Sequence, residues 1–300
     1  MDNAPAPRHH GPGPLREEAA IRLFLLTTLA MVAFAANSLL NRLALSGAEI
    51  GPAAFAAIRV CAGAAVLLLL LGLRHRALPP VSRPAPWAVA GLAVYLLGFS
   101  FAYVSMDAGL GALLLFGGVQ CTMFLGALIE GDRPPLRRWL GVGLSLAGLA
   151  LLAAPRGAAT APLPALACMT LAALGWGIYS LAGRRVTDPL AATAWNFACA
   201  APLVLLALAL LPDGGTPSAR GIALALASGG ITSGLGYALW YALLPRLGAT
   251  RGALAQLSVP AIALALAALL LGEPVTPTAL TSALLILGGI AVGLLPRRRP

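Results

Sequence analysis

The sequence contains no lysine and few charged residues of any kind. Charged residues make up 10% of its 300 positions, and all 20 basic residues are arginine. A soluble domain carries about 25% charged residues, so this composition excludes an ordinary soluble protein. A pump driven by ATP through a GxxxxGK[ST] loop is excluded as well, because that loop requires a lysine.

Histidine and cysteine are also scarce, which argues against metal, cofactor and enzyme chemistry. The 3 histidines form no HExxH motif, and the 4 cysteines stand singly in apolar runs without CxxC spacing, at Cys61, Cys121, Cys168 and Cys199. We therefore expect reduced thiols, no metal site, no cofactor and no catalytic residue. Ser145 lies in a stretch that only approximates GxSxG, and no histidine in an apolar run could activate it. An intramembrane enzyme is kept as the less favoured alternative.

Long hydrophobic runs fill most of the chain. Hydrophobic residues account for 59% of the sequence, and the mean hydropathy is +0.88. A helix of about 20 apolar residues spans a bilayer, and ten such runs are separated by gaps that often contain proline. They lie at 20–41, 53–73, 86–104, 108–129, 137–154, 163–182, 189–211, 219–243, 249–271 and 277–295. The predicted fold is an all-α polytopic membrane protein, with the lipid bilayer as a partner.

One short pattern occurs twice, at the same place in each half of the chain. Residues 127–134 read ALIEGDRP and residues 268–275 read ALLLGEPV, and the surrounding stretches 108–155 and 249–296 align without a gap. This self-similarity predicts a duplicated unit of five spans. The predicted organisation is a disordered cytoplasmic tail and two five-helix repeats, at 1–18, 19–155 and 163–296.

Arginine is distributed unequally between the gaps. If the N-terminus is cytoplasmic, 16 of the 20 arginines lie on that side, Arg42, Arg156 and Arg220 lie on the other, and Arg59 lies within a span. Basic residues concentrate in cytoplasmic loops, so both termini are predicted to be cytoplasmic. Because five spans per repeat reverse the direction of insertion, the second repeat is inverted, an arrangement that suits alternating access around a central site. The net charge of +10 follows from this topology, and no nucleic-acid partner is expected.

The repeated segments resemble the EamA-type transporters of the drug/metabolite transporter superfamily. The resemblance rests on the ten spans, on the duplicated unit, and on the runs WLGVGLSLAGLALL from Trp139 and LLILGGIAVGLL from Leu284 that follow the G-[DE] pairs. It implies two five-helix bundles around a central cavity. It also implies a small-molecule substrate, usually a metabolite, amino acid or drug that is exported.

Arg59 is the charged residue predicted to lie deepest in the membrane. It follows Pro52 by seven residues and therefore lies about 10 Å into its span. A charge at this depth should face the protein interior and could attract a substrate carboxylate. The alternative is an arginine that snorkels or pairs with carbonyls at a helix end. The second repeat has Asn196 at the aligned position, so the charge would bias the cavity towards anions or zwitterions.

Several polar and aromatic residues are further candidates for a substrate site. Asn37 and Asn41 share one helix face and must find partners across helices or in a wet cavity. Tyr95, Phe99 and Tyr103 form an aromatic stripe, which packing or interfacial anchoring would also explain. The predicted substrate-binding set is Arg59, Asn37, Asn41, Tyr95, Tyr103, Gln120, Trp176, Tyr179, Tyr237 and Gln256.

The sequence leaves two questions open: whether transport is coupled to protons, and whether the GxxxG motifs make contacts within or between subunits. Asp132 and Glu273, in the repeated G-[DE] pair, are expected to cap or orient helix ends. Because the acids fall at span ends or in loops, the sequence does not decide between proton coupling and facilitated diffusion. The GxxxG motifs at 230–234 and 289–293 permit close helix contact, either within a subunit or between the subunits of a homodimer.

Together these features predict a secondary transporter in the inner membrane. We expect it to export small organic metabolites, such as amino acids or drugs, by alternating access. A facilitative, channel-like uniporter is the alternative within the same class.

Overall fold

The computed structural model of the chain is entirely helical in the part that it describes. The described residues are 14–76, 84–131, 133–153, 162–183, 186–211, 213–214 and 216–294. The helices are α1 (Pro14–Ser46), α2 (Pro52–His75), α3 (Pro86–Tyr103), α4 (Ala108–Ile129), α5 (Leu136–Ala153), α6 (Leu163–Gly183), α7 (Pro189–Leu210), α8 (Ala219–Leu226), the π-helix η1 (Ala227–Leu235), α9 (Gly236–Gln256), α10 (Ser258–Leu266), the π-helix η2 (Ala267–Leu271) and α11 (Pro277–Leu294).

These helices form the ten predicted membrane segments. Seven are long and apolar enough to cross a bilayer, and two shorter apolar helices and α5 complete the set. Proline is the first residue of α1, α2, α3, α7 and α11, because it lacks the N–H that a first-turn residue leaves unpaired. The proline-containing gaps therefore mark the start of several helices. The predicted fold class, an all-α polytopic membrane protein, is confirmed.

Two predicted boundaries differ from the structure. Helix α1 begins at Pro14, so residues 14–18 are helical, and 1–13 lie outside the described residues. The gap predicted at 244–248 is also helical, since α9 continues to Gln256, although the apolar span itself ends at Leu247. This stretch contains Pro245 and Gly248, the two residue types least favourable in a helix, which is why the sequence indicated a gap there.

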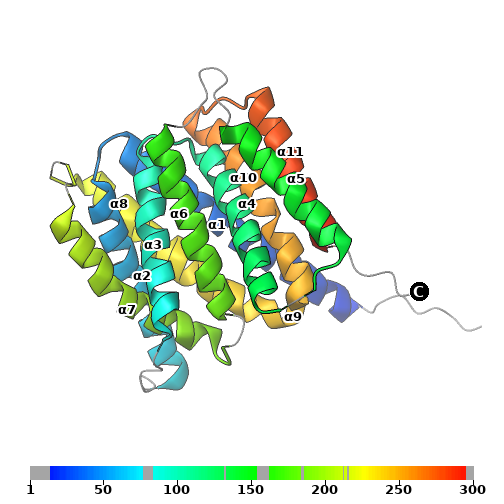
Figure 1. Cartoon of the computed structure of the whole chain (residues 1–300). Coiled ribbons are helices and arrows are strands. Elements are labelled where there is room, and N and C mark those ends of the chain that lie inside the picture. The colour runs from blue at the N-terminus through cyan, green and yellow to red at the C-terminus, as the bar shows by residue number, and fades with distance from the viewer. Residues whose placement is uncertain are drawn as a thin grey trace, which may run out of the picture.

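Several contacts between helices follow the symmetry of the two repeats: replacing each helix by the equivalent helix of the other repeat gives another observed contact. Helices α2 and α7 pack together, as do α5 and α11, and in each pair the partners are equivalent spans of the two repeats. The contact of α3 with α6 matches that of α9 with α1, and the contact of α4 with α6 matches that of α10 with α1. Such paired contacts are those of two inverted repeats around a pseudo-two-fold axis in the membrane plane. Figure 1 shows α6 beside α3 and α5 against α11.

The two GxxxG motifs are used within the chain. A Cβ atom on Gly289 would lie 2.5 Å from the Gly141 carbonyl oxygen, and one on Gly234 would lie 2.9 Å from Val66. The Ser145 hydroxyl, next to the first of these contacts, donates to the Gly141 carbonyl at 3.0 Å. Small residues thus bring α5 against α11, and η1 against α2, inside one subunit.

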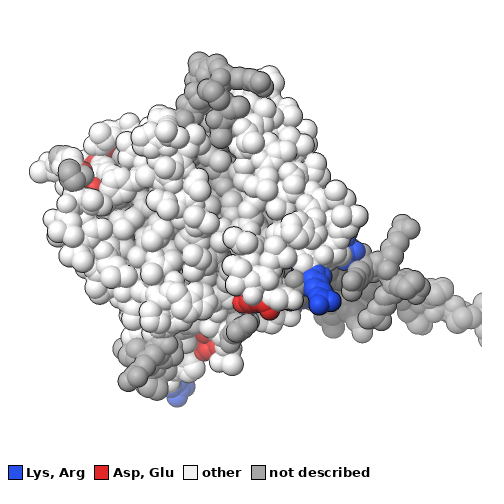
Figure 2. Space-filling model, in the orientation of Figure 1, with Lys and Arg blue, Asp and Glu red and all other residues white. Residues whose placement is uncertain are grey.

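The outer surface is apolar. Large side chains such as Leu163, Leu269 and Ile129 are more than three-quarters exposed, as residues that face lipid should be. In Figure 2, the coloured charged residues lie near the edges of the visible face, and its broad middle carries no charge. The four cysteines are free thiols, as predicted.

Candidate functional site

A cavity of about 650 Å³ lies between the two halves and opens at one end of the bundle. Its mouth is lined by exposed or half-exposed residues of the α2–α3 and α6–α7 connections, including Pro84 and Asp188, and by Trp87 in the first turn of α3. Deeper in, its lining includes Phe34, Trp176, Tyr179, Asn196, Tyr237 and Gln256. This volume lies within the range of about 300–1,000 Å³ that is usual for small-molecule sites, and the largely apolar lining is also typical of them.

A second, much smaller space adjoins the deep end of the cavity. This chamber has a volume of about 30 Å³ and shares Phe34, Trp176, Tyr237 and Gln256 with the larger cavity. Its other lining residues include Asn37, Ser38, Tyr95, Phe99 and Thr232. Leu115 and Phe116 add a side from α4. The chamber therefore lies where α1, α3, α4, α6 and the η1–α9 segment meet.

Buried hydrogen bonds hold the polar side of the chamber. The Asn37 carbonyl oxygen Oδ1 accepts from the Ser228 hydroxyl at 2.6 Å and from the Thr232 hydroxyl at 3.1 Å. The Asn41 amide donates to the Asn37 backbone carbonyl at 2.9 Å, and the Ser100 hydroxyl donates to Asn41 Oδ1 at 3.2 Å. These contacts tie α1 to η1 and α3 and so fix the position of the Asn37 side chain.

Arg59 lies behind the aromatic wall of the chamber and is fully buried. Its Nε donates to the Ser233 hydroxyl at 3.2 Å, and its Nη2 donates to the Tyr95 hydroxyl at 2.8 Å. Its Cζ is 5.1 Å from the ring centroids of both Tyr95 and Phe99. Its Nη1 has no hydrogen-bond partner among the described residues. The partners of this buried cation are thus neutral hydroxyls and ring faces.

The aromatic wall of the site extends from Tyr95 to rings on α6 and α9. The Trp176 ring lies 4.7 Å from Tyr95, 5.3 Å from Tyr179 and 5.5 Å from Tyr237, measured between ring centroids. The Tyr179 hydroxyl donates to Thr193 at 3.2 Å, which anchors the ring to α7. Rings from α3, α6 and α9 thus give a continuous surface on which an apolar or planar group can stack.

The structure brings together six of the ten predicted site residues at the cavity and the chamber: Asn37, Tyr95, Trp176, Tyr179, Tyr237 and Gln256. The other four are not among the described lining residues. Arg59 lies behind the Tyr95 ring, Asn41 lies in the hydrogen-bond network, and Tyr103 is buried with its hydroxyl 3.4 Å from the Ala108 carbonyl. Gln120 is half-buried on α4. A role in substrate binding remains a prediction for all ten residues.

Sequence reasoning missed several polar residues of the site. Ser228, Thr232 and Ser233 reach Asn37 and Arg59 from η1, where a π-helical winding replaces the α-helical period. A π-helix inside a helix often marks a functional site, but it leaves no plain sequence signal. Asn196, noted only as the counterpart of Arg59, lines the large cavity, and its buried Oδ1 has no partner among the described residues.

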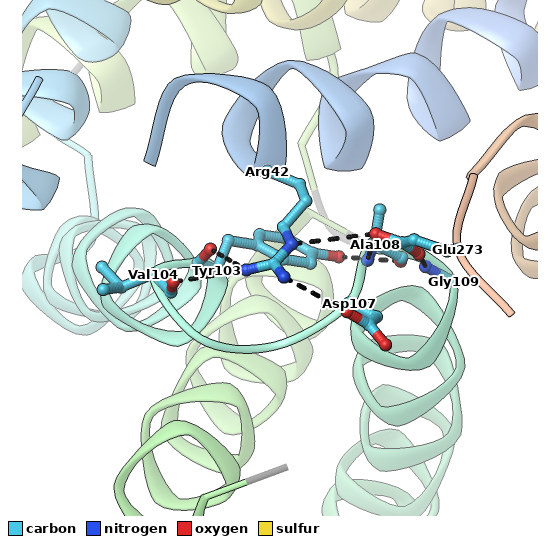
Figure 3. Close-up of polar contacts among 7 residues, drawn as sticks. All are labelled: Arg42, Tyr103, Val104, Asp107, Ala108, Gly109 and Glu273. Atoms are coloured by element: carbon cyan, nitrogen blue, oxygen red, sulfur yellow. Dashed lines mark hydrogen bonds and ion pairs between the residues drawn. The ribbon is translucent and has the colours of Figure 1, made fainter. Parts of the chain in front are cut away.

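The end of the bundle opposite the mouth is held together by contacts between the repeats, and we call it the latched face. Arg42 of the first repeat pairs across the repeat boundary with Glu273, with 3.8 Å between Nε and Oε1. Its Nη2 also lies 3.2 Å from Oδ1 of Asp107 in its own repeat. The Glu273 carboxylate also accepts from the backbone N–H groups of Ala108 at 2.8 Å and of Gly109 at 3.2 Å. Figure 3 shows Arg42 reaching both acids from α1. The capping role predicted for Glu273 is confirmed, while Asp132 lies outside the described residues.

Further acids on the latched face also join the two repeats. Asp213 accepts from the N–H groups of Ala53 and Ala54, both at 2.6 Å, at the start of α2. Glu49 accepts from the Ser218 hydroxyl and pairs with Arg220 at 3.3 Å. Acceptors at helix N-termini satisfy orphan N–H groups and the positive end of the dipole. This end of the bundle is therefore closed by several contacts between the repeats. The opposite end is open, and there the exposed Arg74 side chain pairs with Asp188 at 3.6 Å.

Burial raises the pKa of Glu273 above its ordinary value of 4.5. The hydrogen bonds from Ala108 and Gly109 oppose this shift, as does Arg42, while the neighbouring Asp107 adds to it. The latched arrangement therefore binds a proton on Glu273 more readily than a solvent-exposed carboxyl would.

Acidification is expected to strengthen the latched face. Because the pKa of Glu273 is raised, protonation of this carboxyl stabilises the latched face fully below about pH 4.5. This stabilisation is lost as the pH rises through the raised pKa. We expect hydrogen exchange at the start of α4, corrected for its intrinsic pH dependence, to become slower as the pH falls through the raised pKa of Glu273. The Glu273→Gln variant should lose this response. An equal response in the variant and the natural protein would show that Glu273 is not the titrating group.

An inverted pair of five-span repeats, with a cavity open at one end and a fastened opposite end, defines a polytopic membrane transporter. The chain belongs to the EamA-like transporter family, whose model matches residues 22–154 and 163–295, one match in each repeat. The family lies in the drug/metabolite transporter superfamily, as the sequence resemblance indicated.

Three known proteins are similar to the chain. An uncharacterised protein of Pseudomonas aeruginosa is 49% identical over 281 residues, covering 92% of this chain and 96% of that protein. A probable amino-acid metabolite efflux pump of Salmonella typhimurium is 29% identical over 258 residues, covering 76% of this chain and 85% of that protein. One crystal structure superimposes with a TM-score of 0.67 at 22% identity, covering 93% of this chain and 99% of that one, which supports the fold.

Proposed function

We propose that this protein exports small organic metabolites, amino acids among them, across the inner membrane by alternating access. The observation that carries the proposal is the asymmetry of the bundle, which has a cavity of about 650 Å³ open at one end and several inter-repeat ion pairs and helix caps at the other. Alternating access requires such an arrangement, because two inverted halves can exchange the open end for the fastened one.

The distribution of arginine supports a direction for this cavity. The mouth lies at the α2–α3 and α6–α7 connections, on the side that carries most of the arginines. Cytoplasmic loops are enriched in basic residues, so both termini and the mouth are assigned to the cytoplasm. A substrate would then enter from the cytoplasm and leave through the latched face. The efflux-pump name of the Salmonella relative agrees with export.

Flux through the purified protein in proteoliposomes tests this proposal. We expect saturable export of one or more amino acids from preloaded vesicles. The flux should be about tenfold lower in Trp176→Ala, because the Trp176 ring contacts three other rings in the cavity wall. Trp139→Ala is the matched control, since Trp139 is half-exposed on α5 and contacts Phe124. Flux equal to that of protein-free vesicles, for every solute in a broad metabolite panel, would contradict the proposal.

A further inference from the structure

Arg59 is a buried cation for which the described residues supply no counter-ion. The side chain is fully buried, it makes no ion pair among the described residues, and its Nη1 has no hydrogen-bond partner there. None of the residues that line the chamber is acidic, and the one acid in the described lining of the larger cavity, Asp188, lies at its mouth. A buried charge without a partner is strongly unfavourable. An anion that enters from the cavity would supply the counter-charge that Arg59 lacks.

The chamber next to Arg59 has room for one small charged group. Its volume is about 30 Å³, and one water molecule requires about 10–15 Å³ measured in this way. A carboxylate fits this space, whereas a ring does not. The rings of Tyr95 and Phe99 form the chamber wall on the side of Arg59, with the guanidinium carbon 5.1 Å from each ring centroid.

Two hydrogen-bond donors are available at the chamber. The Tyr95 oxygen accepts from Arg59 Nη2 at 2.8 Å, which leaves the hydroxyl proton of Tyr95 free to be donated. The Asn37 Oδ1 is occupied by two hydroxyl donors, and the Asn37 NH₂ group has no hydrogen-bond partner among the described residues. Hydrogen bonds from such donors to a carboxylate are stronger than bonds to a neutral acceptor.

We propose that the chamber is a carboxylate subsite, and that the substrate is an organic carboxylate with an apolar or ring-bearing body. The carboxylate accepts hydrogen bonds from Asn37 and Tyr95 within the field of Arg59, and the body stacks against Trp176 and Tyr237 in the larger cavity. Arg59 acts through Tyr95 and is thus a positioning residue. This inference rests on the proposed transport function, because it names the class of solute that is carried.

Binding of a matched acid and amide tests the subsite. The probes are 3-phenylpropionate and 3-phenylpropionamide, which differ in charge but share one ring and one chain length, and their affinities for purified protein at pH 7 are measured by calorimetry. We expect the natural protein to bind the acid at least about tenfold more tightly than the amide. Arg59→Gln should reduce this preference to less than about twofold, and Tyr95→Phe should reduce it to an intermediate value.

Two controls make the test decisive. Arg138→Gln removes an exposed guanidinium on α5 and should keep the full preference for the acid. If Arg59→Gln does not yield monodisperse protein, Tyr95→Phe decides, because it keeps both the ring and the cation. Equal affinities for acid and amide in the natural protein, binding of neither probe, or an unchanged preference in both variants would overturn the subsite.

The flux assay separates this inference from the proposed function. Saturable amino-acid flux together with equal binding of acid and amide would reject the subsite and leave the transporter proposal intact. Preferential binding of the acid without flux of any solute would support the subsite and reject transport.

Discussion

Replacing Glu273 by alanine is expected to loosen the latched face of the molecule. The Glu273 side chain is only 12% exposed, and its carboxylate holds the first two backbone N–H groups of α4 and lies beside Arg42. Hydrogen bonds to a charged group contribute about 1.5–3 kcal/mol each. Even if water recovers half of this energy, the loss of two bonds shifts the equilibrium by about 1.5–3 kcal/mol, or on the order of 10- to 100-fold.

Hydrogen exchange measures this effect where the contacts are broken. We expect the peptide that begins at Ala108 to exchange on the order of 10- to 100-fold faster in Glu273→Ala than in the natural protein. Glu18→Ala removes an exposed carboxylate near the start of α1 and should leave the rate unchanged. Unchanged exchange in Glu273→Ala would mean that the carboxylate does not hold the two repeats together at this end.

A leucine at Gly289 is expected to prevent normal packing of α5 against α11. A Cβ atom there would lie 2.5 Å from the Gly141 carbonyl oxygen and 2.9 Å from the Ser145 backbone nitrogen, both backbone atoms that cannot rotate away. The two helices must separate, and overpacking of this kind costs about 3 kcal/mol or more. At about 2–4 °C per kcal/mol, the thermal midpoint of the detergent-solubilised protein should fall by roughly 10 °C.

The neighbouring glycine provides a matched control for this substitution. A Cβ atom on Gly288 would meet no atom within 4 Å, so Gly288→Leu should leave the thermal midpoint within about 2 °C of that of the natural protein. Equal midpoints for Gly288→Leu and Gly289→Leu would show that the close α5–α11 contact does not limit stability.

The sequence predicted the membrane segments well because each depends on local composition. Apolar runs of sufficient length, interrupted by proline, set most helix boundaries without reference to the rest of the chain. The duplicated G-[DE] pattern likewise predicted that Glu273 caps a helix, which the contacts with Ala108 and Gly109 show. It did not indicate which helix, because α4 belongs to the other repeat.

The candidate site was less predictable because it depends on how helices are rotated against one another. Arg59 was expected to face the interior and is fully buried, but its depth alone did not reveal that the Tyr95 ring lies between it and the chamber. Ser228, Thr232 and Ser233 reach the site through the π-helical winding of η1. That winding depends on the fit of η1 against α1 and α2 and is not encoded in a simple periodic pattern.

We propose that this transporter is a carrier whose cavity is exposed to one side of the membrane at a time. Counterflow in proteoliposomes tests it most directly, with vesicles loaded with an unlabelled solute that shows saturable flux and the labelled solute added outside. A carrier returns its binding site by exchange, so we predict transient accumulation of label above its equilibrium level, and a strong reduction of that overshoot in Trp176→Ala. Label that only equilibrates, without an overshoot at any internal concentration, would contradict alternating access and identify a channel-like uniporter.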